Sequence, residues 1–228
     1  MTLTDRIVAL SAELAGPGDP PDTPAMLALL RLLFRVGRDD LPLGRLFEGH
    51  VDACQIVTRY GDAAQAAALA ATLRDGGTLG VWNADLPGDP LRLDGDRMFG
   101  GKSFASGAGL LSHALVSVDE GGGRQLLLID LAAQPPAIDR SFWKVVGMQR
   151  SETHIVRWDG TAITERNRIG RPGDYVREPW FSGGALRFAA VQAGGIAALV
   201  DGVRDHLGKI DRAGDPHQSG RLARLFGL

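Results

Sequence analysis

The chain has 228 residues, a net charge of −2 and a hydrophobic content of 44%, which is enough apolar material for a substantial core. Its 25 basic residues are scattered and form no run, so the sequence carries no electrostatic signature of nucleic-acid or anionic-membrane binding. Cys54 is the single cysteine, which excludes an internal disulfide, and no apolar run approaches the roughly 20 residues that span a bilayer. We expect a soluble, cytoplasmic protein that contacts neither nucleic acid nor a membrane.

Residues 1–77 are predicted to form an N-terminal helical region. Apolar residues recur at three-to-four spacing near the start, and Thr23-Pro24 offers a capping hydroxyl followed by the proline typical of a first helical turn. A dense apolar pattern indicates a third helix that stops near Tyr60. A fourth helix is predicted to begin at Asp62 and to end at Gly76-Gly77, which is a typical C-terminal stop signal.

Residues 78–170 are predicted to form a central β-domain. Short β-rich runs are separated by turn signals such as Gly121-Gly122-Gly123 and Asp159-Gly160. Because no helical segments intervene between these runs, the pattern favours an antiparallel sheet or barrel over a Rossmann unit. The expected fold class is therefore α+β, with an antiparallel β-barrel between two helical parts.

Residues 171–228 return to the helical period and are predicted to begin a C-terminal helical domain that is incomplete. An apolar stripe runs through Leu186–Val200, and Gly194-Gly195 within it permits the close approach of another helix. One side of this stripe is expected to remain uncovered within a single chain. We therefore expect a homodimer or higher homo-oligomer in which a second chain covers it.

Five short motifs occur in order along the chain. They are Tyr60-Gly61-Asp62, Gly80–Asp85, Lys102-Ser103-Phe104-Ala105-Ser106, Gly147-Met148-Gln149-Arg150-Ser151 and Arg187–Gly195. Together with the order of helices, β-domain and helices, they resemble the acyl-CoA dehydrogenase superfamily. The third motif is similar to the family's Lys-x-Trp-x-(Thr/Ser), and the fourth is similar to its Gly-Met-Arg-x-Ser turn. The chain is identified on this resemblance as a truncated or divergent member, or a fragment of a longer protein.

The resemblance implies FAD as cofactor and assigns residues to it. Phe104 would be the aromatic wall beside the flavin ring, and Ser106 the hydroxyl near the ring atom N5. Trp82, Asn83 and Ala84 would line the other edge of the ring, mainly through backbone groups. Ala84 stands where the family usually has threonine, so one side-chain hydrogen bond worth about 1 kcal/mol would be lost.

Two further family features concern the C-terminal part. Arg212 lies where the family places an arginine that reaches the cofactor diphosphate of a neighbouring subunit. The family's catalytic carboxylate usually lies in the C-terminal helical domain, and no glutamate follows Glu178 in this sequence. The sequence therefore assigns no catalytic residue.

The function implied is an FAD-dependent acyl-CoA dehydrogenase-like oxidoreductase. It would act on a small-molecule acyl thioester or a related substrate, with the electron acceptor left open. Two alternatives stay open at this point: a flavin-dependent monooxygenase on the same fold, and a non-catalytic binding or assembly protein that retains the barrel without flavin. No metal site is predicted, because no two histidines have ligand spacing, and no Gly-x-Ser-x-Gly elbow indicates a serine hydrolase.

Overall fold

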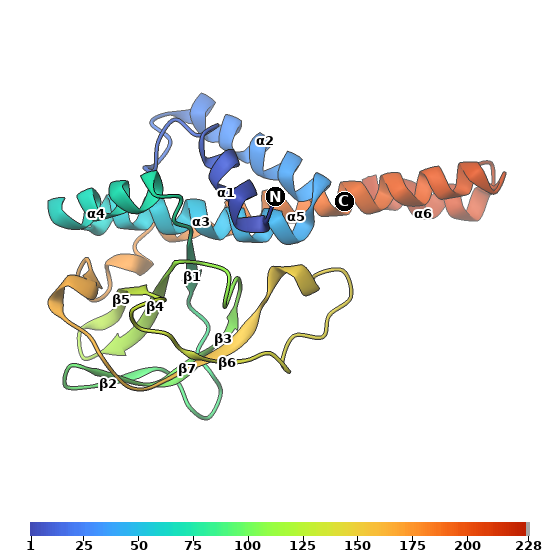
Figure 1. Cartoon of the computed structure of the whole chain (residues 1–228). Coiled ribbons are helices and arrows are strands. Elements are labelled where there is room, and N and C mark those ends of the chain that lie inside the picture. The colour runs from blue at the N-terminus through green and yellow to red at the C-terminus, as the bar shows by residue number, and fades with distance from the viewer. Residues whose placement is uncertain (227–228) are drawn as a thin grey trace.

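The computed structural model describes residues 1–226, so the last two residues of the predicted C-terminal region lie outside the described part of the chain. It is an α+β structure in which helices form one layer and two small sheets form the other (Figure 1). The helices are α1 (Leu3–Ser11), α2 (Thr23–Asp39), α3 (Leu41–Tyr60), α4 (Ala63–Arg74), α5 (Trp180–Lys209) and α6 (Pro216–Phe226). The strands are β1 (Leu79–Trp82), β2 (Arg92–Asp94), β3 (Arg97–Ala105), β4 (His113–Glu120), β5 (Gly123–Asp130), β6 (Ala137–Asp139), β7 (His154–Ala162) and β8 (Arg168–Ile169).

The N-terminal helices begin and end largely where local signals indicate. Helix α4 starts after Asp62, whose side chain accepts a hydrogen bond from the amide of Gln65, while the Gln65 side chain accepts one from the amide of Asp62. The prediction that the Thr23 hydroxyl caps α2 is wrong by one residue. Asp22 is the cap, because its carboxylate accepts from the amide of Ala25 at 2.8 Å, and Thr23 becomes the first helical residue.

The strands of the described chain form two open four-stranded sheets, so the predicted antiparallel barrel is not confirmed. Their orders are β1-β4-β5-β8 and β2-β3-β7-β6. Strand β1 runs parallel to β4, because the β2–β3 hairpin that separates them in sequence belongs to the other sheet, and all other pairs are antiparallel. Side chains from both sheets, including Trp82, Met98, Val116 and Val156, meet in one buried cluster, so the sheets pack face to face.

Helix α5 packs along α2 by means of glycines. A Cβ atom added at Gly194 would lie 2.1 Å from the carbonyl oxygen of Phe34, and one added at Gly37 would lie 2.3 Å from that of Val191. Both separations are impossible for a real side chain, so the two backbones meet only because these positions are glycine. The prediction that Gly194-Gly195 allow a close helix contact is confirmed.

The predicted apolar stripe of α5 does not coincide with its buried face. Leu186 and Ile196 are 49% and 52% exposed, whereas Arg187, Val191 and Gly194 are buried. By length and composition alone, α5 is long and apolar enough to span a membrane. Only 28% of its most apolar stretch is buried, so the helix leaves an apolar face uncovered within one chain.

Candidate functional site

The two segments predicted to face a flavin lie side by side. The amide of Ser103 donates to the carbonyl oxygen of Ala84 at 3.0 Å, and the Ser103 hydroxyl donates to the carbonyl oxygen of Asp85 at 2.9 Å. Asp85 and Lys102 also form an isolated β-bridge. The chain that leaves β1 is therefore held along β3, directly beside Phe104.

Trp82 belongs to the core rather than to the surface of the site. Its side chain is buried between the sheets, with its ring centroid 6.4 Å from that of Trp158. Its indole Nε1 donates to the carbonyl oxygen of Ser106 at 2.9 Å. Trp82 thus holds the backbone of Ser106 from the core side of the sheet. Asn83 is half-buried, and Ala84 is exposed at the end of β1.

Phe104 combines an exposed ring with an uncommon backbone conformation. It is 55% exposed and has φ of 53°, in the left-handed region that non-glycine residues rarely adopt. A register shift in the β3–β7 pairing, between Lys102 and Ala105, accompanies this conformation. The ring makes edge contacts with Phe142 and Trp143, at centroid separations of 5.1 and 6.5 Å. A three-ring aromatic surface results.

Ser106 ends a chain of hydroxyl groups next to this surface. Thr153 Oγ1 donates to Ser106 Oγ at 3.1 Å, and the Thr153 and Ser151 hydroxyls lie 2.8 Å apart. The Ser151 hydroxyl also donates to the carbonyl oxygen of Met148 at 2.8 Å, so the single proton of Thr153 is shared between Ser151 and Ser106. Ser106 itself is buried, with 8% of its surface exposed. Because a hydroxyl can donate one hydrogen bond and accept two, Ser106 Oγ retains capacity for a hydrogen bond to a bound molecule.

A charged cluster follows the hydroxyl chain. Glu152 Oε2 accepts from Arg140 at 2.5 Å and lies 2.9 Å from Nε2 of the buried His154. The sequence did not indicate this cluster or the part played by Phe142 and Trp143. Their segment is distant from Phe104 in sequence, and the β3–β7 and β6–β7 pairings bring it there.

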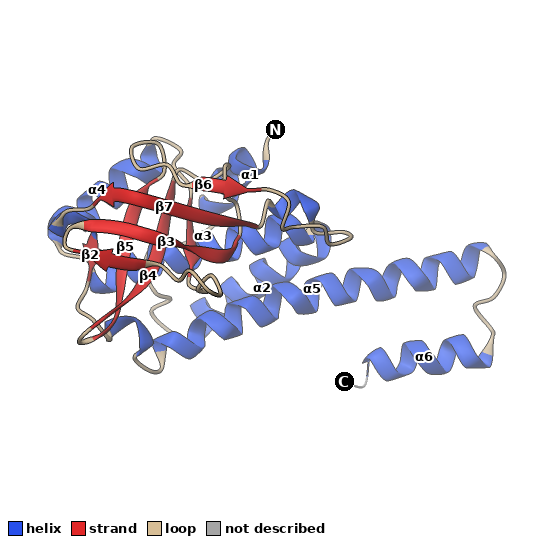
Figure 2. Cartoon of the chain, turned by 90° about the horizontal axis from the view of Figure 1, so that it is seen from below, coloured by secondary structure: helices blue, strands red, loops and turns tan. Residues whose placement is uncertain are grey.

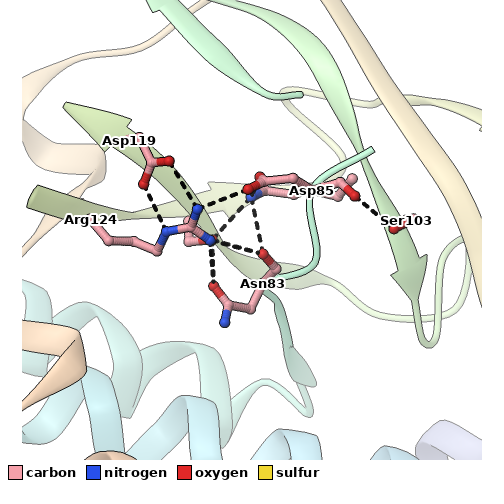
Figure 3. A network of polar contacts seen from close by, with 7 residues as sticks. Asn83, Asp85, Ser103, Asp119 and Arg124 are labelled. Atoms are coloured by element: carbon pink, nitrogen blue, oxygen red, sulfur yellow. Dashed lines mark hydrogen bonds and ion pairs between the residues drawn. The ribbon is translucent and has the colours of Figure 1, made fainter. Parts of the chain in front are cut away.

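A buried lysine stabilises the end of β1. Lys102 has no exposed surface, and its Nζ donates to Asp85 Oδ1 at 2.6 Å and to Ser117 Oγ at 3.0 Å. Arg124 donates to the other oxygen of Asp85 at 2.8 Å and to Asp119 at 2.9 Å (Figure 3). Burial opposes ionisation of Asp85, but the hydrogen bonds and charges of Lys102 and Arg124 outweigh it and lower the pKa of this carboxyl. The carboxylate stays charged and keeps both cations in place.

Asn83 connects this network to a small cleft between α3 and the start of α5. Its Oδ1 accepts from Ser117 at 2.6 Å, and its carbonyl oxygen accepts from Arg124 at 3.3 Å. The cleft has a volume of about 260 Å³ and is also lined by Asp52 on α3 and Trp180 on α5. The end of β1 therefore lies beside Phe104 and also borders an opening in the helical layer.

Arg212 is not brought to this site. It is exposed and follows α5 in the turn that leads to α6, and its amide donates to the carbonyl oxygen of Leu207 at 2.8 Å. That turn forms the far tip of the α5–α6 hairpin, away from both sheets (Figure 2). The turn that carries Arg212 therefore lies apart from the sheet that carries Phe104.

The fold and the arrangement of its parts define an acyl-CoA dehydrogenase-like structure. No protein-family model matches the sequence. No curated protein matches it in sequence either. The likeness therefore stands on the three-dimensional structure, where many solved chains agree with it.

Three solved structures illustrate the likeness. Butyryl-CoA dehydrogenase from Megasphaera elsdenii aligns with a TM-score of 0.74 and 16% identity, over 98% of this chain and 64% of that one. Dibenzothiophene monooxygenase TdsC from Paenibacillus sp. A11-2 aligns with 0.67 and 19%, over 87% and 54%. The FAD complex of PigA aligns with 0.64 and 16%, over 89% and 59%. At these identities the fold is shared, and the chain spans between half and two thirds of each neighbour.

Proposed function

We propose that this chain binds FAD at the segment from Phe104 to Ser106 and is part of a flavin-dependent oxidoreductase. The observation that carries the proposal is the pairing of an exposed aromatic ring in a left-handed backbone conformation with the nearby hydroxyl of Ser106, which contacts Thr153 and retains capacity for a further hydrogen bond. Uncommon backbone geometry of this kind concentrates at functional sites. The names of several structural neighbours, among them a butyryl-CoA dehydrogenase and an FAD complex, agree with it.

The residues present suit the ring of a flavin. The Phe104 ring would form an apolar wall that keeps water from one face, and Ser106 would donate a hydrogen bond to an acceptor at the ring edge. Bound FAD would supply the capacity to accept a hydride. The opening bordered by Asn83 between α3 and α5 is our candidate for the acyl group of a thioester or related substrate.

Flavin-dependent oxygenation is a second candidate reaction. Glu152, the carboxylate next to the hydroxyl chain, is already engaged by Arg140 and His154, which makes it a poor base for removing a substrate proton. Oxygenation needs no such base, and TdsC, a neighbour with this fold, carries the name of a monooxygenase. The choice between the two reactions follows from substrate turnover with and without oxygen once FAD binding is established.

The proposal includes a second copy of the chain. The turn that carries Arg212 lies apart from both sheets, so another copy would bring this residue to a cofactor bound at Phe104. The uncovered apolar face of α5 offers the surface for such an assembly. Charged groups on α5, such as Asp201 paired with Arg38 of α2 at 2.5 Å, favour a protein partner over a lipid bilayer.

The test is a titration of the purified protein with FAD, followed by visible absorbance and by the quenching of flavin fluorescence. We expect saturable binding that weakens at least tenfold in a variant that combines Phe104→Ala with Ser106→Ala. Phe99→Ala on the same strand is the control, because its ring packs on Arg92 instead. An affinity equal in the wild type and the double variant would refute the assigned site.

A second substitution tests the same site through an expected gain in FAD affinity. The side chain of Ala84 cannot donate a hydrogen bond, so Ala84→Thr is expected to strengthen FAD binding about fivefold, equivalent to about 1 kcal/mol. Ala84→Val is the matched control, because it adds the same bulk without the hydroxyl. Equal effects of the two substitutions would show that the end of β1 does not face the ring edge.

A further inference from the structure

A large cavity lies in the helical layer, on a different face of α3 from the opening at Asn83. Its volume is about 1180 Å³, and it is bounded by α1, the loop that follows it, α2, α3 and the end of α4. Pockets that hold small organic molecules are mostly smaller than this. The cavity shares no residue with the flavin assignment or with the opening at Asn83, so it can hold a molecule of its own.

The wall of the cavity on α2 and α3 is apolar and uncharged. Leu29 and Leu32 of α2 and Val51 of α3 line it, and the buried His50 and Cys54 belong to the same wall. Burial lowers the pKa of His50 to about 4 and raises that of the Cys54 thiol to about 12, so both are neutral at pH 7. This wall suits an aliphatic chain and is unfavourable for a buried ionic group.

Three arginines also line the cavity. They are Arg31 and Arg35 on α2 and Arg74 on α4, and all three are exposed, so the cavity is open to solvent beside them. Arg35 is paired with Glu13, another lining residue, at 2.5 Å. Within residues 1–226, the side chains of Arg31 and Arg74 form neither an ion pair nor a hydrogen bond. Two guanidinium groups are therefore available to a bound anion.

The acidic groups of the cavity are already neutralised. Besides Glu13, the lining contains Asp19, whose carboxylate accepts a hydrogen bond from Nε of Arg59 at 2.8 Å. The positive charge that remains unbalanced lies on Arg31 and Arg74. This charge favours an anionic ligand over a neutral or a cationic one.

We propose that this cavity binds a medium-chain aliphatic carboxylate. The chain lies against Leu29, Leu32 and Val51, where it gains the free energy of leaving water. The carboxylate stays at the opening and accepts hydrogen bonds from one of the two unpaired arginines, Arg31 or Arg74. A guanidinium presents parallel N–H groups that match the two oxygens of a carboxylate. Because this end of the ligand remains in contact with water, it avoids the cost of burying a charge.

The experiment is isothermal titration calorimetry at neutral pH with octanoate and with 1-octanol, which has a chain of the same length but no charge. We expect the wild type to bind octanoate about tenfold more tightly, as expected for a hydrogen bond to a charged group. A variant that combines Arg31→Gln with Arg74→Gln should bind both molecules equally. The control combines Arg221→Gln with Arg224→Gln on α6, which removes the same charge at exposed positions outside the cavity and should keep the tenfold preference.

A second variant tests the location of the ligand. Ala28 is exposed at the cavity edge on α2, so Ala28→Trp is expected to obstruct the cavity without disturbing the core and to weaken binding of both molecules at least tenfold. Ala68→Trp, at an exposed position of α4 outside the cavity, should leave both affinities unchanged. Octanoate bound at the opening near Asn83 would not respond to Ala28→Trp, and that result would overturn the assigned location.

Three results with the wild type and the arginine variant would also overturn the proposal. They are no binding of octanoate, equal affinities of the wild type for octanoate and 1-octanol, and a preference for octanoate that survives the loss of both Arg31 and Arg74. None of these results depends on whether FAD binds at Phe104.

Discussion

Single residues in this protein are held in unusual protonation states by burial. Burial raises the pKa of Glu48 on α3 to about 7, with the charge of Asp52 adding to the effect and Arg45 and Arg187 opposing it. The pKa of the nearby His50 falls to about 4 for the same primary reason, which is burial. A carboxyl and an imidazole two residues apart are thus both neutral over part of the pH range.

These two groups predict opposite contributions to stability between pH 5 and 7. The contribution of Glu48 is fully present below its ordinary pKa of 4.5 and is lost as the pH rises through about 7, because the folded state holds the proton longer. His50 contributes above its ordinary pKa of 6.5 and loses that contribution as the pH falls toward 4. Each effect amounts to about 2 kcal/mol over this interval, so they nearly cancel.

Glu48→Gln is therefore expected to reveal the effect of His50. On acidification from pH 7 to pH 5, the free energy of unfolding of this variant should fall about 2 kcal/mol more than that of the wild type. Urea unfolding at several pH values measures the difference. Glu165→Gln, at an exposed carboxylate, serves as the control and should follow the wild-type curve. Parallel curves for Glu48→Gln and the wild type would contradict the prediction.

At the scale of elements, the contact between α2 and α5 determines how the C-terminal helix joins the rest. Gly194→Ala would place a methyl group 2.1 Å from the carbonyl oxygen of Phe34, and the helices would have to separate. We expect a loss of about 2–3 kcal/mol in the free energy of unfolding, measured by urea denaturation. Gly202→Ala is a control on the same helix, where a Cβ meets nothing within 4 Å, and it should stabilise by about 1 kcal/mol. Similar effects of both substitutions would refute a glycine-dependent contact.

The same elements show what the sequence could predict. Helices α3 and α4 were predictable, because the stop at Tyr60 and the cap at Asp62 are local interactions. Strands β2, β6 and β8 were not, because each is two or three residues long and is defined by its partner strand. The buried face of α5 was misassigned, because glycines rather than large apolar residues face α2.

In the candidate site, too, residues within one short motif were predictable and residues joined by long-range pairing were not. Phe104 and Ser106 were identified because they lie in one contiguous motif. Thr153, which donates to Ser106, comes 47 residues later and is brought there by strand pairing. Arg212 was assigned to the cofactor of a neighbouring subunit, and that assignment stays a prediction.

At the scale of the whole molecule, the uncovered face of α5 predicts self-association. Exposed apolar side chains on this face include Leu186, Ile196, Leu199 and Val203. Combining Ile196→Asp with Leu199→Asp should weaken association at least about tenfold, as measured by light scattering coupled to size-exclusion chromatography. Val146→Asp, at a 95% exposed residue of the β6–β7 loop, should leave the oligomer unchanged. A monodisperse wild-type monomer at micromolar concentration would contradict the prediction.

The protruding turn between α5 and α6 has a practical consequence. At Gly208 and Gly214, which flank it, an added side chain would meet nothing within 4 Å, and the turn lies apart from both sheets (Figure 2). Exposed tips of this kind tolerate inserted sequence. A peptide tag or fluorescent label placed there would leave the sheets and the cavities intact. A label at this turn would allow the proximity between copies of the chain to be followed in solution.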